Sequence, residues 1–125
     1  MASIAFSVPV KPGKTADAKK LAEMLGGQRA ADHDETHRDH GVRRLKVYHQ
    51  GQPNEAIIVY IEADDIKAAM TNRAASEHEF DEWFGKMIED VTGYHPDQHF
   101  HAPPSEILLD WHEEKGHKVR GEHGS

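Results

Sequence analysis

Hydrophobic and polar residues along the chain follow two periods, one typical of β-strands and the other typical of α-helices. Large apolar residues alternate with small or polar ones over residues 3–10, which predicts a strand with one buried face. Residues 42–49 alternate in the same way, and the turn GQPN at 51–54 leads from this second strand into a third. The third strand, over residues 55–62, is apolar on both faces. Such a strand needs cover on both sides of its sheet.

Apolar residues spaced three and four apart predict helices between and after these strands. Segments 15–25 and 28–40 follow the first strand, and segment 65–75 follows the third. The stretch SEHEFDEWFGKMIEDVT then has a broad stripe of aromatic and aliphatic residues, and Gly93 ends this last helix. The stripe predicts a helix that packs on the core.

A last strand is predicted over residues 105–111, where apolar residues alternate, although a short helix also fits so short a segment. With this strand the order is βαββαβ, the ferredoxin-like α+β pattern of a four-stranded antiparallel sheet with helices on one face. The other face would remain open, so we expect a second copy to cover it in a homodimer formed through the sheets. Residues 1–111 are expected to form one domain and residues 112–125 a flexible charged tail.

The composition excludes several classes of partner and chemistry. The 125 residues have a formal net charge of −7, whereas nucleic-acid binding requires a basic face. No segment approaches the ~20 apolar residues of a membrane span, and the N-terminus lacks the pattern of a secretory signal. We therefore expect a cytoplasmic protein with no nucleic-acid or membrane partner. The absence of cysteine excludes disulfides, thiolate nucleophiles and thiolate zinc sites.

Three segments, SIAFSVPVKPGK, AIIVYIEADD and FDEWFGKMIEDVTG, are similar to the dimeric α+β barrel superfamily. This superfamily includes antibiotic-biosynthesis monooxygenases, polyketide cyclases and heme-handling enzymes. Within it the chain resembles a bacterial family of small uncharacterised proteins that share a PGK-type turn, an EADD-type strand end and an FDxWF-type helix. The resemblance covers about residues 3–111. It implies an enzyme that oxygenates, cyclises or isomerises a small molecule.

The eleven histidines include three in the stretch ADHDETHRDHG, namely His33, His37 and His40. At about 100° per residue of an α-helix, these three side chains lie on one narrow stripe. The segment has no aliphatic stripe, so we expect the histidines to face the sheet and line a pocket there. The alternative is a polar helix face on which all three point into water.

Three functions fit this pattern. In the first, the pocket is an enzyme site in which His33, His37 or His40 acts as the general base and Tyr60 as the proton donor, with Glu62, Trp83 and His49 as ligand-binding residues. In the second, the same three histidines hold a divalent transition metal or heme, and His99 and His101 form a weaker second cluster of metal ligands. In the third, the protein is a non-catalytic dimeric module that binds a small molecule. The cofactor is left open between none, a metal and heme.

Overall fold

The computed structural model of the chain describes residues 2–74, 76–94 and 106–119. Its elements in chain order are β1 (Ala2–Pro9), α1 (Thr15–Gly26), α2 (Ala30–Asp39), β2 (Val42–Gln50), β3 (Ala56–Ala63), α3 (Ile66–Ala74), α4 (Glu79–Thr92), β4 (Leu109–His112) and β5 (Gly116–Val119). The helices and strands predicted up to residue 92 are confirmed, with small shifts at their ends.

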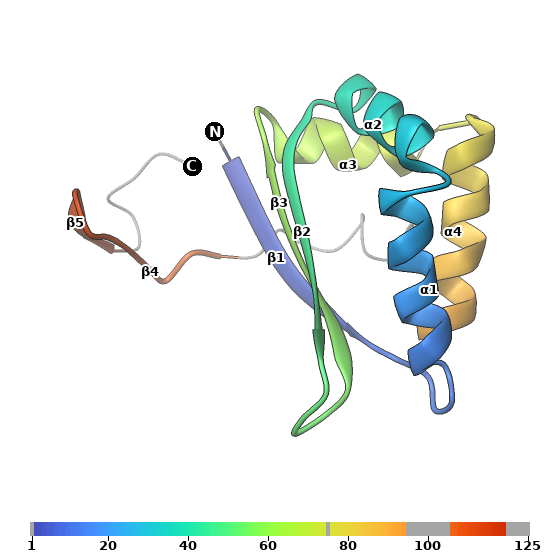
Figure 1. The fold of residues 1–125 in the computed structure, drawn as a ribbon. Helices are drawn as coiled ribbons and strands as arrows, with labels where there is room; N and C mark the ends of the chain where they lie inside the picture. The colour runs from blue at the N-terminus through green and yellow to red at the C-terminus, as the bar shows by residue number, and fades with distance from the viewer. Residues whose placement is uncertain (1, 75, 95–105, 120–125) are drawn as a thin grey trace.

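The main sheet has the antiparallel order β1-β3-β2, and the four helices lie on one side of it (Figure 1). Ile61 of β3 pairs with Ile4 of β1 and with Leu45 of β2, so side chains in register with these three share one face of the sheet. This face is turned toward the helices. The alternate positions, including Ile58 and Tyr60 of β3, point to the opposite, open face.

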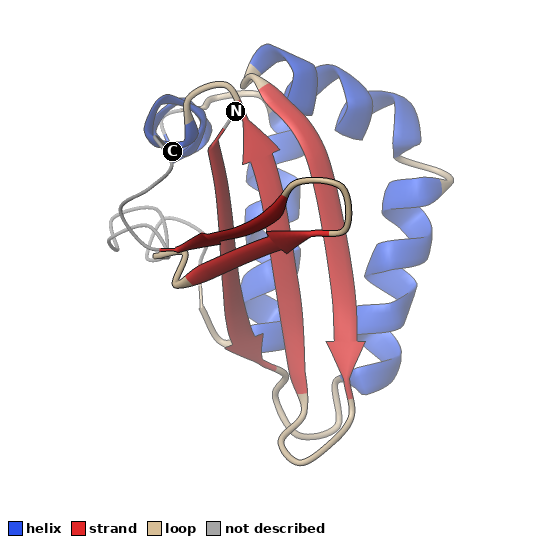
Figure 2. Ribbon diagram, turned by 90° about the vertical axis from the view of Figure 1, so that its left-hand side faces the viewer, coloured by secondary structure: helices blue, strands red, loops and turns tan. Residues whose placement is uncertain are grey.

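The prediction of a four-stranded sheet is corrected by the structure. Within the described residues the main sheet has three strands, and β4 pairs with β5 in a separate two-stranded hairpin. The hairpin lies in front of the open face in Figure 2. Pairing β4 with its neighbour in sequence closes a short loop, which costs less chain entropy than pairing with the distant β1. The apolar alternation predicted a strand here but contained no information about its partner.

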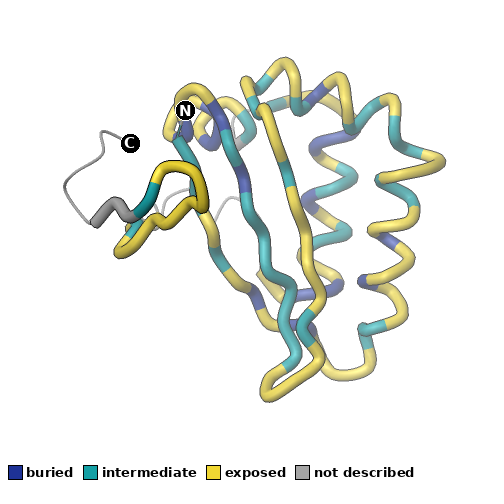
Figure 3. The backbone as a smooth tube through the Cα atoms, turned by 60° about the vertical axis from the view of Figure 1, so that its left-hand side comes forward, coloured by how far each residue is buried: buried dark blue, intermediate teal, exposed yellow. Residues whose placement is uncertain are grey.

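The hairpin also runs across the predicted boundary at residue 111, because β4 ends at His112 and β5 at Val119. Leu109 and Trp111 of β4 are more than half exposed, and Figure 3 shows exposed residues along the described part of the hairpin and most of β2. None of the helices in the described residues has the length and apolar character of a membrane span.

Two clusters of buried residues join the helices to the sheet. The larger cluster links the end of β3 to α3, and the smaller one links α1 and α4 to the segment that follows β1. The larger contains Ile61, Ala63, Ile66, Ala69 and Met70, and the smaller Val10, Ala18 and Val91. The helices and the sheet therefore pack against each other at two separate places.

Gly93 ends α4 in the left-handed conformation, with φ of 83°, and its N–H donates to the Glu89 carbonyl at 2.8 Å. We expect Gly93→Ala to lower the free energy of unfolding by about 1–2 kcal/mol, because an L-residue is strained there. An added Cβ would meet only ordinary contacts with Lys11, so the backbone alone sets this cost. Gly26→Ala is the control, since Gly26 is helical with open space around it and should change little. Urea unfolding measures both, and equal losses would contradict the explanation.

Candidate functional site

A cavity of about 650 Å³ lies between the helices and the sheet. Most of its lining is aliphatic. The apolar residues lining it from the sheet are Phe6, Val8, Val42, Leu45, Val47, Ile57, Val59 and Ile61, and those from the helices include Ala18, Leu21, Ala22, Leu25, Ala30, Ala69, Met70, Phe84, Ile88 and Val91. Its volume falls within the range of sites for small organic molecules, roughly 300–1,000 Å³.

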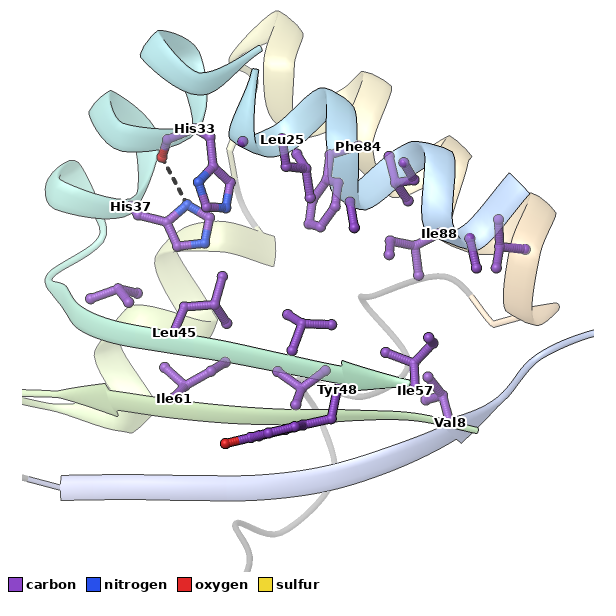
Figure 4. Close-up of a pocket in the computed structure, with 18 of the residues that line it drawn as sticks. Val8, Leu25, His33, His37, Leu45, Tyr48, Ile57, Ile61, Phe84 and Ile88 are labelled. Atoms are coloured by element: carbon purple, nitrogen blue, oxygen red, sulfur yellow. Dashed lines mark hydrogen bonds between the residues drawn. The ribbon is translucent and has the colours of Figure 1, made fainter. Parts of the chain in front are cut away.

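The three histidines of α2 line one end of this cavity. Figure 4 shows the rings of His33 and His37 pointing from α2 toward the sheet. Between them Thr36 is buried, and its hydroxyl donates to the Asp32 carbonyl at 3.0 Å. Ala30 is the aliphatic residue that α2 contributes to the cavity lining, and the imidazole rings supply most of the rest of this face.

The orientation of His37 is set by a backbone hydrogen bond. Its Nδ1 lies 2.9 Å from the His33 carbonyl oxygen. Because a carbonyl only accepts, Nδ1 carries the hydrogen and Nε2 keeps a free lone pair in the neutral ring. Burial, followed by the charges of His33 and Arg73, lowers the pKa of His37 from 6.5 to about 3. His37 is therefore a neutral hydrogen-bond acceptor at neutral pH.

The ring of His33 lies between those of His37 and Phe80. Its centroid is 4.0 Å from the His37 centroid and 6.1 Å from the Phe80 centroid. Its Nε2 is buried and has no hydrogen-bond partner among the described residues. Burial and the charge of Arg73 lower the pKa of His33, while Asp34 acts in the opposite direction. An unpaired buried polar atom is costly, so this nitrogen is suited to a group supplied by a ligand.

His40 is held differently. Its Nε2 lies 2.9 Å from Oδ2 of Asp81, whose side chain is 4% exposed. Burial acts to raise the pKa of Asp81, but hydrogen bonds from Ser76 and His40 and the charge of Arg73 lower it overall. A charged carboxylate therefore lies directly behind the histidine end of the cavity and fixes the His40 ring.

Sequence reasoning missed two residues at this end of the cavity: Arg73, which lines it, and Asp81, which lies behind His40. Arg73 of α3 lines the cavity with its guanidinium 4.5 Å from the Phe84 ring centroid, and burial lowers its pKa. Its positive charge affects both His33 and His37. Nothing in the local sequence indicates that these two residues are buried, because charged residues on helices usually face water.

The other predicted site residues lie away from the histidine end of the cavity. Tyr60 and Glu62 lie on the open face of the sheet, opposite the cavity, and burial together with the charge of Glu62 raises the pKa of Tyr60. Trp83 stacks against Arg29, with 4.4 Å from its ring centroid to the guanidinium carbon. His49 lines the far end of the cavity and lies 2.8 Å from Glu55. The structure thus brings His33, His37 and His40 together, and neither Tyr60 nor Glu62 joins them.

A metal centre gains no support from the part of the chain that the structure describes. Within it, no three histidine, aspartate or glutamate side chains converge as metal ligands. His99 and His101, the predicted weaker cluster, lie outside the described residues. Which cofactor the protein uses, if any, stays open.

No family model matches the chain, and no curated protein matches it. A solved structure does: L-rhamnose mutarotase FA22100 from Formosa agariphila, with a TM-score of 0.60, 14% identity, and coverage of 90% of this chain and 100% of that one. The chain has the ferredoxin-like α+β fold. At 14% identity, this similarity concerns the fold alone.

The lowered pKa of His37 predicts a loss of stability in acid. The unfolded chain takes up a proton at His37 below about pH 6.5, whereas the folded chain does so only near pH 3. Stability should therefore fall by up to about 2 kcal/mol from pH 7 to pH 5, with His33 acting in the same direction. Urea unfolding at several pH values should show a smaller loss in His37→Gln. The exposed His112→Gln is the control, and equal pH dependence in all three proteins would contradict this account.

Proposed function

We propose that the protein is an enzyme that isomerises a small molecule by moving a proton within the cavity between the helices and the sheet. One observation carries this proposal: the neutral rings of His33 and His37 line a cavity large enough for a substrate, and Nε2 of His37 keeps a free lone pair. General bases act through such lone pairs. The fold similarity to a mutarotase, itself an isomerase, agrees with a reaction of this class.

His33 is the better candidate for the base. The Nε2 of His33 is unpartnered among the described residues, and the pKa of His37, at about 3, makes His37 a weak base. Catalytic bases work best with pKa values close to the operating pH. His37 then acts mainly as a hydrogen-bond acceptor, and Asp81 positions His40. Tyr60, on the open face of the sheet, has no role in this cavity.

Two probes test the proposal. Deuterium incorporation into an enolisable ketone in D₂O measures proton removal from carbon, and polarimetry of fresh L-rhamnose solutions measures interconversion of its anomers. We expect the protein to accelerate at least one of the two above the buffer rate. Failure to accelerate either would contradict the proposal.

The mainly aliphatic lining also suits a second function, a non-catalytic module that binds an apolar molecule. This module would bind a ligand with no change in its isotopic content or anomeric form. Binding without turnover therefore favours the module, and turnover that depends on His33 favours the enzyme. The predicted cytoplasmic location remains a prediction.

The predicted homodimer is a further part of the proposal, with the open face of the sheet as its interface. Ile58 and Tyr60 give the middle of this face an apolar character, and Tyr48 beside them is 51% exposed. The chain's own hairpin lies over part of the same face, near Ser3 and Tyr60. Burial of such apolar surface by a second copy stabilises a dimer.

We expect Ile58→Lys to weaken this dimer, because it places a charge in the middle of an apolar interface. Sedimentation velocity should give wild-type protein a mass of twice the 14.1 kDa chain, and the variant the mass of one chain. Lys20→Glu, on an exposed position of α1, is the control and should remain dimeric. A wild-type monomer at micromolar concentration would contradict the dimer.

A further inference from the structure

We infer that the cavity takes a mainly apolar molecule with an enolisable carbonyl group at one end, and that it does not take a sugar. The inference rests on the proposed proton transfer and names the class of substrate for that same site. It is carried by an asymmetry of the cavity. His33, Asp34, His37, His40 and Arg73 give one end a polar lining, whereas most of the remaining lining is aliphatic and its polar members are Lys19, Tyr48, His49 and Thr92.

The apolar part decides against a sugar. Leu21, Leu25, Ile57, Ile88 and Val91 line the cavity away from the histidines and offer no hydrogen-bonding side-chain atom. Figure 4 shows Ile57 and Ile88 on the side of the cavity away from His33 and His37. A sugar has hydroxyls around its whole ring, and each one buried without a partner costs about 1–3 kcal/mol. An apolar chain or aromatic ring, by contrast, gains free energy against these side chains.

The histidine end of the cavity determines which functional group of the ligand can bind there. Nε2 of His37 keeps a lone pair, and Nε2 of His33 has no hydrogen-bond partner among the described residues. The positive charge of Arg73 acts on both rings. The positive charge of Arg73 attracts a carbonyl oxygen of the ligand. The imidazole of His33 can then take a proton from the carbon next to that carbonyl. A carboxylate fits less well, because the lone pair of the fixed His37 tautomer would repel it.

The proton transfer follows from this placement. The C–H bond next to the carbonyl breaks, its proton moves to Nε2 of His33, and its electron pair forms a C=C bond. The π pair of the carbonyl moves to oxygen, where the positive charge of Arg73 stabilises the enolate. His33 then returns a proton to the oxygen, which gives the enol, or to the same carbon, which can invert it. The reaction needs no oxidant or reductant.

Three probes of similar size test the inference: 4-phenylbutan-2-one as an apolar ketone, butylbenzene as its hydrocarbon counterpart, and L-rhamnose as a sugar. Titrations followed by protein NMR should give the ketone the tightest binding, with shifts at His33 and His37. The ketone should also exchange its α-hydrogens for deuterium faster than in buffer. Binding of L-rhamnose but not of the ketone, or binding of no probe, would overturn the inference.

These outcomes separate the substrate class from the proposed function. If the ketone binds at the histidines, and the protein accelerates neither its deuterium exchange nor the interconversion of the L-rhamnose anomers, the ligand class is supported and the isomerase proposal fails. If the anomers of L-rhamnose interconvert faster and the ketone does not bind, proton transfer is supported and the inferred substrate class fails.

The variant Arg73→Met tests the carbonyl contact, because it keeps an unbranched side chain and removes the charge. We expect it to reduce the affinity for the ketone about tenfold while the affinity for butylbenzene stays within about twofold. Arg73→Lys, which retains the charge, provides a second test if Arg73→Met does not fold. An unchanged preference for the ketone over the hydrocarbon in folded Arg73→Met would overturn the assignment of the carbonyl to Arg73.

Discussion

His33→Gln is expected to slow proton transfer by about 10²–10⁴-fold, the usual contribution of a positioned general base. This applies to whichever of the probes the wild-type protein turns over. Glutamine has a similar reach and can still form hydrogen bonds, but it cannot take a proton at neutral pH. Its effect should therefore fall on kcat much more than on KM. The same deuterium-exchange or polarimetric assay measures the loss.

Two comparisons make this result specific to His33. His37→Gln should cost less, because the pKa of His37, about 3, already makes it a weak base. His112→Gln, at an exposed histidine of the hairpin, should leave the rate unchanged. A folded His33→Gln protein that retains the wild-type rate would remove His33 from the mechanism.

Phe80→Ala is expected to lower the free energy of unfolding by about 3–5 kcal/mol, a large fraction of the 5–15 kcal/mol typical of such a domain. Phe80 is fully buried at the start of α4. Its ring stacks with Phe84 at 5.9 Å, lies 5.7 Å from Trp83, and contacts the edge of His33. Truncation would leave a cavity bordered by all three rings. Urea or thermal unfolding measures the loss.

Phe80→Leu is the matched variant, since it keeps most of the buried volume and should lose clearly less stability. Because Phe80 supports His33, folded Phe80→Ala protein should also show altered NMR shifts at His33. A loss below about 1 kcal/mol for Phe80→Ala would show that α4 does not depend on this side chain.

The secondary structure was predictable because it depends on local periods. Alternation over residues 3–10 and spacing of three and four over residues 15–25 each reflect the geometry of a single element. The shared stripe of His33, His37 and His40 followed from the same geometry, because neighbours on one helix keep their angular relation in any fold. The structure places these three side chains at one end of the cavity.

The partner of the last strand was not predictable, because pairing depends on which edges meet in space. Leu109 and Trp111 alternate with polar residues equally well in a hairpin and in a four-stranded sheet. Tyr60 illustrates a similar limit. The third strand is apolar on both faces, so its pattern did not identify the face that meets the helices, and Tyr60 was assigned to the histidine pocket although it lies on the opposite face.

The pattern of residues along the chain was enough to predict the type and order of the elements as far as α4, and the shared stripe of His33, His37 and His40. The surroundings of those histidines, by contrast, depend on how the helices pack. Arg73 and Asp81 come from α3 and α4, 33 and 41 residues after His40, and they act on the imidazoles through charge and a hydrogen bond. Such forces depend on distance in space, and a linear pattern of residues does not contain that distance.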